Sequence, residues 1–234
     1  MKNILWILPS FLTSISLMSG FLSLMYVSVN NFKSAAWLII FSIFMDALDG
    51  KVARMTKRVT KFGEQYDSIA DIVAFGVAPA NLIYNLMIFN NINPIISFSA
   101  AFLVVLTGAL RLARFNITED KKTAFQGMPI PGGAGIIASY VLFCSKYGID
   151  FKNGILIFLA IVVSMLMISN LPYPSGKQKK AGRANRKLIF LSIIALALIT
   201  RYHIEFFAFM GMFYLCYGPV KFILIKLRRE INES

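Results

Sequence analysis

Runs of predominantly apolar residues, each long enough to cross a membrane, constrain this chain more than any other feature. A helix needs about 20 apolar residues to span the hydrocarbon core of a bilayer. The chain is 57% hydrophobic, and its apolar runs occupy residues 8–29, 34–56, 64–89, 94–115, 131–147, 154–171, 187–201 and 205–226. The run at 187–201 is short, so a tilted or interfacial helix is the alternative there. We therefore predict an all-α, polytopic membrane bundle of about eight transmembrane helices.

The basic residues alternate between the two ends of these predicted helices. Of the 24 Lys and Arg residues, 20 lie in the segments 1–3, 51–63, 111–130, 173–187 and 221–234. Because loops rich in Lys and Arg face the cytoplasm, we expect both termini to be cytoplasmic in a multi-pass protein of the cell membrane. The net charge of +13 is concentrated beside the predicted spans. This position favours contact with anionic lipid head groups over nucleic-acid binding.

Four of the six aspartates of the chain lie within or beside two of these apolar runs. A helix turns by about 100° per residue. One face of the helix predicted at 34–56 therefore presents Asp46, Asp49, Gly50, Ala53 and Arg54. One side of the next helix presents Gly63, Asp67 and Asp71. Because the link between the helices is short, we expect them to be antiparallel neighbours whose carboxylates converge near the cytoplasmic end of the membrane.

Four converging carboxylates repel one another and need compensating positive charge. Ligand sets made only of oxygen suit hard cations such as Mg²⁺, Mn²⁺ or Ca²⁺. In the alternative, Arg54 and nearby lysines neutralise the acids in a buried network, but one arginine leaves much negative charge uncompensated. Ionisable residues inside a membrane are usually functional. The sequence therefore favours a divalent-metal site.

Three small residues and one arginine accompany the carboxylates. Gly50, Ala53 and Gly63 either let a ligand approach the backbone closely or let two helices pack closely, and their spacing does not distinguish these roles. Arg54 offers a forked guanidinium that suits phosphate oxygens. Metal ions beside an arginine and an open helix face indicate a substrate that contains a pyrophosphate.

The full pattern is D-x2-D-G-x2-A-R-x8-G-x3-D-x3-D, from Asp46 to Asp71. It resembles the complete signature of the CDP-alcohol phosphatidyltransferase family, with no departure. The resemblance implies two divalent ions, held by Asp46, Asp49, Asp67 and Asp71, around a CDP-linked donor. It also implies that Asp71 is the catalytic base, that the pyrophosphate and nucleotide are bound by Asp49, Gly50, Ala53, Arg54 and Gly63, and that the protein is a homodimer.

A second stretch, from Arg111 to Gly133, lies on the expected cytoplasmic side. Arg111 and Arg114 are spaced to face one pocket, although arginines that reach toward the membrane interface would show the same spacing. The segments RLARFN and FQGMPIP resemble the second characteristic region of the bacterial, integral-membrane phosphatidylserine synthases, a branch of the same family. This resemblance implies that Arg111, Arg114 and Asn116 bind the acceptor. It covers most of the chain and is consistent with one domain over residues 1–234, with a catalytic core at about 1–171 and further helices at about 187–226.

The implied reaction transfers a phosphatidyl group from CDP-diacylglycerol to the hydroxyl of L-serine, giving phosphatidylserine and CMP. Within the family, the alternative acceptors are glycerol 3-phosphate and an inositol compound. A phosphorylated acceptor should require more cationic groups than Arg111 and Arg114 provide. A cation transporter is the alternative from another class of protein. The sequence disfavours a transporter, because the acids inside the predicted spans are concentrated between residues 46 and 71, and the one other, Glu205, is the first residue of the last span.

Overall fold

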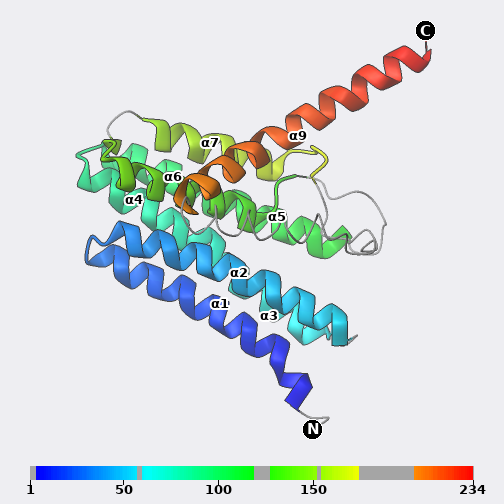
Figure 1. Cartoon of the computed structure of the whole chain (residues 1–234), viewed down its shortest axis with the longest axis horizontal. Coiled ribbons are helices and arrows are strands. Elements are labelled where there is room, and N and C mark those ends of the chain that lie inside the picture. Colours follow the sequence, from blue (N-terminus) through cyan, green and yellow to red (C-terminus); the bar gives the residue numbers. More distant parts are fainter. Residues whose placement is uncertain (1–3, 57–59, 119–126, 152–153, 174–202, 234) are drawn as a thin grey trace, which may run out of the picture.

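The computed structural model describes residues 4–56, 60–118, 127–151, 154–173 and 203–233. Helices account for the regular structure in these residues, and no β-strand occurs among them (Figure 1). In chain order the elements are α1 (Ile4–Ser28), α2 (Phe32–Thr56), α3 (Lys61–Asp71), the π-helix η1 (Ile72–Val77), α4 (Ala78–Phe89), α5 (Pro94–Thr118), α6 (Ile130–Tyr147), α7 (Ile155–Ile168) and α9 (His203–Glu233).

The all-α prediction is confirmed, and seven of the eight predicted apolar runs coincide with these helices. The run predicted at 64–89 is one continuous helical rod made of α3, η1 and α4. The run predicted at 187–201 lies outside the described residues. Within the described part of the chain, four helices are long and apolar enough to cross a membrane: Pro9–Ser28, Lys61–Phe89, Pro94–Ile117 and Ile204–Leu224.

Serine side chains hold α1 and α2 together as an antiparallel pair. The hydroxyl oxygens of Ser16 and Ser42 are 2.8 Å apart, and the Ser23 hydroxyl donates to the carbonyl oxygen of Ala35 at 3.0 Å. Polar groups of this kind need partners inside an apolar layer, and helices that share them are held together. These contacts fix how far α2 is shifted along its axis relative to α1. They therefore also fix the position of the aspartates in the later part of α2 relative to α1.

The helical rod that follows contains a π-helical segment, η1, directly after Asp71. A π-helical turn is wider than an α-helical turn, and such insertions are frequent at functional sites. The helix α1 comes unusually close here, since a Cβ atom at Gly20 would lie 2.6 Å from the Cα of Ala74. Glycine permits this approach because it has no side chain. The contact places the end of α3 beside the α1–α2 pair.

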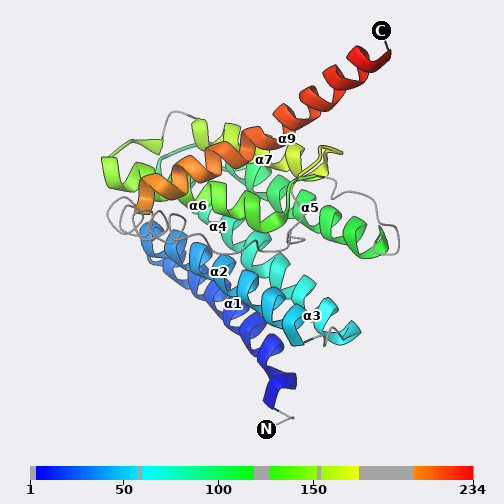
Figure 2. The same cartoon turned by 45° about the vertical axis from the view of Figure 1, so that its right-hand side comes forward.

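The hydrophobic core lies where η1, α4, α5 and α6 pack together. Its largest fully buried side chains include Phe75, Leu82, Ile83, Ile130 and Ile137. The last helix, α9, lies against α6, and its C-terminal end projects away from the rest of the molecule (Figures 1 and 2). Outward-facing apolar side chains are numerous on α1, α5 and α9, as expected for helices that contact lipid.

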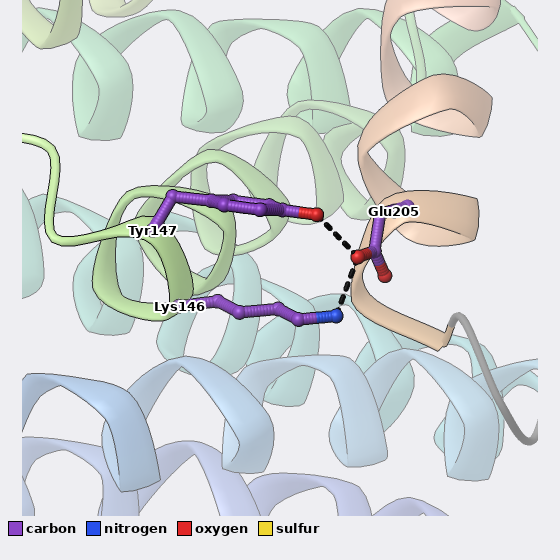
Figure 3. Close-up of polar contacts among 3 residues, drawn as sticks. All are labelled: Lys146, Tyr147 and Glu205. Atoms are coloured by element: carbon purple, nitrogen blue, oxygen red, sulfur yellow. Dashed lines mark hydrogen bonds and ion pairs between the residues drawn. The ribbon is translucent and has the colours of Figure 1, made fainter.

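A polar contact fastens the start of α9 to the end of α6 (Figure 3). One carboxylate oxygen of Glu205 forms an ion pair with Lys146 and accepts a hydrogen bond from the Tyr147 hydroxyl. Both partners come from the last turn of α6. One acidic side chain therefore ties together two helices that are far apart in the sequence.

Candidate functional site

The predicted acidic cluster forms between α2 and α3. Asp46, Asp49 and Asp67 each offer a carboxylate oxygen, and these oxygens all lie within 4.8 Å of one another. The spacing of Asp46 and Asp49 puts both on the same face of α2, and the packing of α1 against both α2 and α3 brings that face to Asp67. The predicted convergence of these three carboxylates is confirmed.

Asp49 is the most deeply buried member of the cluster, with 4% of its surface exposed. Its Oδ2 atom is buried and has no hydrogen-bond partner among the described residues. The Thr13 side chain of α1 lies within hydrogen-bonding reach of the same carboxylate. An ionised carboxylate without full compensation is costly inside a protein. A divalent cation would supply the missing charge and bind the free oxygen, so the residues present fit a metal.

Asp71 is the last residue of α3, one turn beyond Asp67. Its carboxylate is close enough to interact electrostatically with Asp46, Asp49 and Asp67, and also with the guanidinium of Arg111 on α5. The fourth predicted carboxylate is not among the three whose oxygens lie within 4.8 Å of one another, so Asp71 lies beside that cluster and its part in the site stays a prediction. Asp71 differs from the other three because it also adjoins a cation.

Arg111 is almost fully buried, with 6% of its surface exposed. Besides Asp71, the guanidinium has a second charged neighbour, Arg114 of its own helix. A buried guanidinium beside a carboxylate cluster provides a local binding site for an anionic group. The structure thus places one of the two predicted acceptor arginines next to the acidic cluster.

Arg114 reaches the C-terminal end of α7. Its guanidinium donates hydrogen bonds to the carbonyl oxygens of Ile168 at 2.9 Å, Met167 at 3.3 Å and Ser169 at 3.4 Å. The last carbonyl groups of a helix have no partners within the helix, so a cation there satisfies them. The backbone of Gly127, where φ is +83°, packs against the Arg114 guanidinium. A Cβ atom on Gly127 would lie 2.9 Å from Arg114 Nη2. Arg114 therefore fastens α5 to the end of α7.

Asn116, the third predicted acceptor residue, links α5 to α3. Its side-chain amide donates to the Ser68 hydroxyl at 3.2 Å, and Ser68 directly follows Asp67. Asn116 thus lies near the acidic cluster, on the rim formed by the ends of two helices. Both Asn116 and the Ser68–Asn116 contact are exposed.

The remaining predicted residues lie at the ends of α2 and α3. Gly50 and Ala53 are half-buried in α2. The backbone of Arg54 belongs to α2, and its side chain lies outside the described part of the structure. Gly63 is in the first turn of α3, where its N–H donates to the Thr60 hydroxyl oxygen at 3.0 Å and so caps the helix. A Cβ atom at position 63 would lie 3.1 Å from the same hydroxyl oxygen, and this tight contact is a local reason for glycine that its place in the motif did not reveal.

Comparison with known proteins agrees with this geometry. The model of the CDP-alcohol phosphatidyltransferase family matches residues 6–218. The chain belongs to this family. It is 38% identical to the CDP-diacylglycerol–serine O-phosphatidyltransferase of Helicobacter pylori strain J99, in an alignment that covers 99% of this chain and 98% of the relative.

Two archaeal members of the CDP-alcohol phosphatidyltransferase family are also similar. The CDP-diacylglycerol–serine O-phosphatidyltransferase of Methanocaldococcus jannaschii is 38% identical, over 92% of this chain and 94% of the relative. The archaetidylserine synthase of Methanothermobacter thermautotrophicus is 38% identical, over 71% of this chain and 69% of the relative. The names of these relatives share serine as the head group and differ in the lipid.

The docking of α9 on α6 places one aromatic side chain that no motif or periodicity of the sequence predicts. The Tyr214 ring of α9 lies over Gly132 in the first turn of α6, where a Cβ atom would be 2.7 Å from Tyr214 Cε1. It also lies beside the ring of Tyr173, with centroids 5.3 Å apart.

Proposed function

We propose that this protein transfers the phosphatidyl group of CDP-diacylglycerol to the hydroxyl of L-serine, producing phosphatidylserine and CMP. The observation that carries the proposal is the cluster of Asp46, Asp49 and Asp67 within 4.8 Å, with Asp71 next to it and adjoining Arg111. Such a cluster suits a pyrophosphate donor that is bound through metal, and the neighbouring cation suits the carboxylate of an amino acid. The names of the relatives support serine as the acceptor.

The carboxylates Asp46, Asp49, Asp67 and Asp71 would hold two divalent ions, Mg²⁺ or Mn²⁺, with Ca²⁺ as a further candidate. Bound there, such ions neutralise phosphate charge and align the reacting groups. Gly50, Ala53 and Gly63 add little bulk around the carboxylates, which leaves room for the pyrophosphate and the nucleotide. The position of Arg54 in the last turns of α2 suits a contact with the departing CMP.

Asp71 is the proposed base. It takes the proton from the serine hydroxyl, whose oxygen forms a bond with the lipid-linked phosphorus. The bond between that phosphorus and the oxygen of CMP breaks, and CMP leaves with the electron pair. Most of the rate enhancement in such a transfer comes from positioning and from electrostatic stabilisation, and the buried surroundings of Asp49 and Arg111 keep these groups in place.

The acceptor pocket is proposed to include Arg111, Arg114 and Asn116. Arg111 adjoins Asp71, so it is the group best placed to bind the serine carboxylate while Asp71 receives the hydroxyl proton. Arg114 donates to the end of α7, which supports a share in shaping the pocket wall as well. Asn116 lies on the rim beside Ser68.

We also propose that the protein crosses the cell membrane eight times, with both termini and the active site on the cytoplasmic side. The alternation of basic segments along the sequence supports this topology. The family resemblance supports a homodimer and a single domain over residues 1–234.

The decisive assay measures CMP release and the lipid product from CDP-diacylglycerol with purified protein in detergent micelles. L-Serine, glycerol 3-phosphate and inositol are supplied in parallel, and we expect turnover with L-serine. Chelation of divalent metal should abolish turnover, and addition of Mg²⁺ or Mn²⁺ should restore it. Turnover with glycerol 3-phosphate or inositol instead of serine would contradict the proposed acceptor. Full activity after chelation would contradict the metal site.

A further inference from the structure

The helix α3, which carries Asp67, has little apolar packing to fix its orientation. Ala70 is the only buried residue among the 11 residues of α3, all of which the structure describes. The large apolar side chains of Phe62 and Ile69 face outward, with 75% and 59% of their surface exposed. Burial of an apolar face usually fixes the rotation of a helix against its neighbours. Other contacts must therefore determine the direction in which Asp67 points.

A hydrogen bond joins α3 to α1 at the residue before Asp67. The hydroxyl oxygens of Tyr66 and Ser14 are 2.8 Å apart. The Ser14 hydroxyl donates to the carbonyl oxygen of Ser10, one turn earlier in α1, at 2.8 Å. A serine hydroxyl has one proton to donate, so the Tyr66 hydroxyl is the donor in the contact between the two helices. This contact fastens the Tyr66 side of α3 to α1.

A second hydrogen bond joins α3 to α5 at the residue after Asp67. The Asn116 side-chain amide donates to the Ser68 hydroxyl oxygen at 3.2 Å. The Ser68 hydroxyl in turn donates to the carbonyl oxygen of Glu64, one turn earlier in α3, at 3.0 Å. Ser68 therefore has the same arrangement as Ser14. Its proton is directed to a carbonyl group of its own helix, and its oxygen accepts from a neighbouring helix.

The two contacts lie on different sides of α3, with Asp67 between them. Because a helix turns by about 100° per residue, Tyr66 and Ser68 lie on either side of Asp67 around the helix axis. The Asp67 carboxylate faces Asp46 and Asp49, with oxygens within 4.8 Å, and like charges at such distances repel. A rotation of α3 that relieved this repulsion would displace both hydrogen-bonding groups from their partners. The two contacts therefore oppose that rotation.

We propose that Tyr66 and Ser68 are positioning residues for the divalent cation: their contacts with α1 and α5 hold the Asp67 carboxylate in place for metal binding. This inference rests on the proposed function, in which Asp67 is a metal ligand. A site whose groups are ordered before the ligand arrives binds it more tightly, because less conformational freedom is lost on binding. The inference also gives Asn116 a role at the metal site, through Ser68, in addition to the proposed role in acceptor binding.

The test measures Mn²⁺ binding to the purified full-length protein in detergent micelles, without substrate. Electron paramagnetic resonance of the free Mn²⁺ gives the dissociation constant. Tyr66→Phe keeps the aromatic ring, which stacks on Phe62 with centroids 6.2 Å apart, and removes the hydroxyl. Ser68→Ala removes the contact with α5. Each variant should bind Mn²⁺ about 3- to 10-fold more weakly, which is the effect expected for the loss of one hydrogen bond.

Two further variants and a rate measurement separate positioning from a general loss of structure. Ser68→Thr keeps the hydroxyl and should retain the wild-type dissociation constant. Asn116→Ala removes the same contact from the α5 side and should weaken Mn²⁺ binding as Ser68→Ala does. At saturating Mn²⁺, CMP release by Tyr66→Phe and Ser68→Ala should return to within about twofold of the wild-type rate, because excess metal compensates for lower affinity.

Two controls remove similar groups elsewhere in the bundle. Ser99→Ala in α5 removes a hydroxyl that donates to the carbonyl oxygen of Ile95, one turn earlier, at 2.8 Å. This bond matches the local hydrogen bond of Ser68. Tyr84→Phe removes the hydroxyl of another half-buried tyrosine, in α4 of the same helical rod. Both controls should bind Mn²⁺ with the wild-type affinity.

The outcomes separate this inference from the proposed function. A wild-type dissociation constant in Tyr66→Phe or in Ser68→Ala would overturn the positioning role while the metal site stands. Equal losses of affinity in Ser68→Ala and Ser99→Ala, or turnover that stays low at saturating Mn²⁺, would also contradict it. Wild-type protein that binds no Mn²⁺ would overturn the proposed metal site itself. The contact between Ser68 and Asn116 is exposed, so its removal leaves buried packing intact and the test decides even if Tyr66→Phe is unstable.

Discussion

Asp71 lies beside the acidic cluster and is also a charged neighbour of the Arg111 guanidinium. The other three carboxylates face one another across α2 and α3, whereas Asp71 interacts with them and with Arg111. A carboxylate in this position is suited to receive a proton from a hydroxyl group whose own carboxylate is held by the arginine. The same position also allows Asp71 to complete a metal shell, so a variant must separate the two roles.

We expect Asp71→Asn to lower turnover by about 10²–10⁴-fold, as is typical when a general base is removed. Asparagine keeps the size and one oxygen, but it cannot take up the proton. Calorimetry with CDP-diacylglycerol and Mn²⁺ should show nearly unchanged binding, while single-turnover CMP release becomes slow. As a control, Asp67→Asn should weaken donor binding and rate together. If Asp71→Asn shows this same joint loss, Asp71 acts as a metal ligand and not as a separate base.

At the scale of single elements, the junction of α3 and η1 determines where the aspartates of α3 lie. Gly20 lets α1 approach the backbone of η1 at Ala74, immediately after Asp71. The hydroxyls of Ser16 and Ser42 fix the same stretch of α1 against α2. A shift of α1 therefore changes the distance between the two pairs of aspartates.

Gly20→Ala should lower the stability of the protein and its metal affinity. The added Cβ would lie 2.6 Å from Ala74 Cα, which forces α1 and η1 apart, and such overpacking typically costs about 1–3 kcal/mol. Gly76→Ala is the matched control in η1 itself, since its nearest neighbour, Ile130 Cδ1, would be 3.7 Å away. Melting temperatures with and without Mn²⁺ measure both effects. Equal behaviour of the two variants would show that the Gly20 contact does not position the site.

At the scale of the whole molecule, the site is assembled from helices that are distant in the sequence. The carboxylates come from α2 and α3, and the arginines come from α5. The last helix, α9, is held against α6 because its start is tied to the end of α6 (Figure 3). Chemistry on a lipid-linked donor requires that the site open at one membrane face, and the topology decides which.

Single cysteines can report that topology in intact cells. After Cys144 and Cys216 are replaced by alanine, a membrane-impermeant maleimide should label Asp150→Cys from outside. It should label Lys179→Cys only after the cells are opened, because the segment 173–187 is rich in basic residues and such loops face the cytoplasm. CMP release by both variants serves as the control for folding. Labelling of both positions from the same side would contradict the eight-span topology and the cytoplasmic site.

The sequence by itself determined the all-helical architecture and the convergence of three aspartates. Apolar runs of membrane length predict helices directly, because a backbone in lipid must satisfy its own hydrogen bonds. Asp46 and Asp49 share a helix face through the period of the α-helix, and the short link between the two apolar runs predicts that Asp67 returns close to them. These relations are local, so a sequence pattern can reveal them.

Contacts between helices far apart in the chain were decided only by the tertiary structure. The link from Arg114 to the end of α7, the close approach of Gly20 to Ala74, and the packing of Tyr214 on Gly132 depend on how helices cross and rotate against one another. Packing of small residues and pairing of buried polar groups select those rotations. Many relative rotations of the helices bury the same apolar residues. The spacing of apolar residues along the sequence therefore cannot predict which rotation the protein adopts.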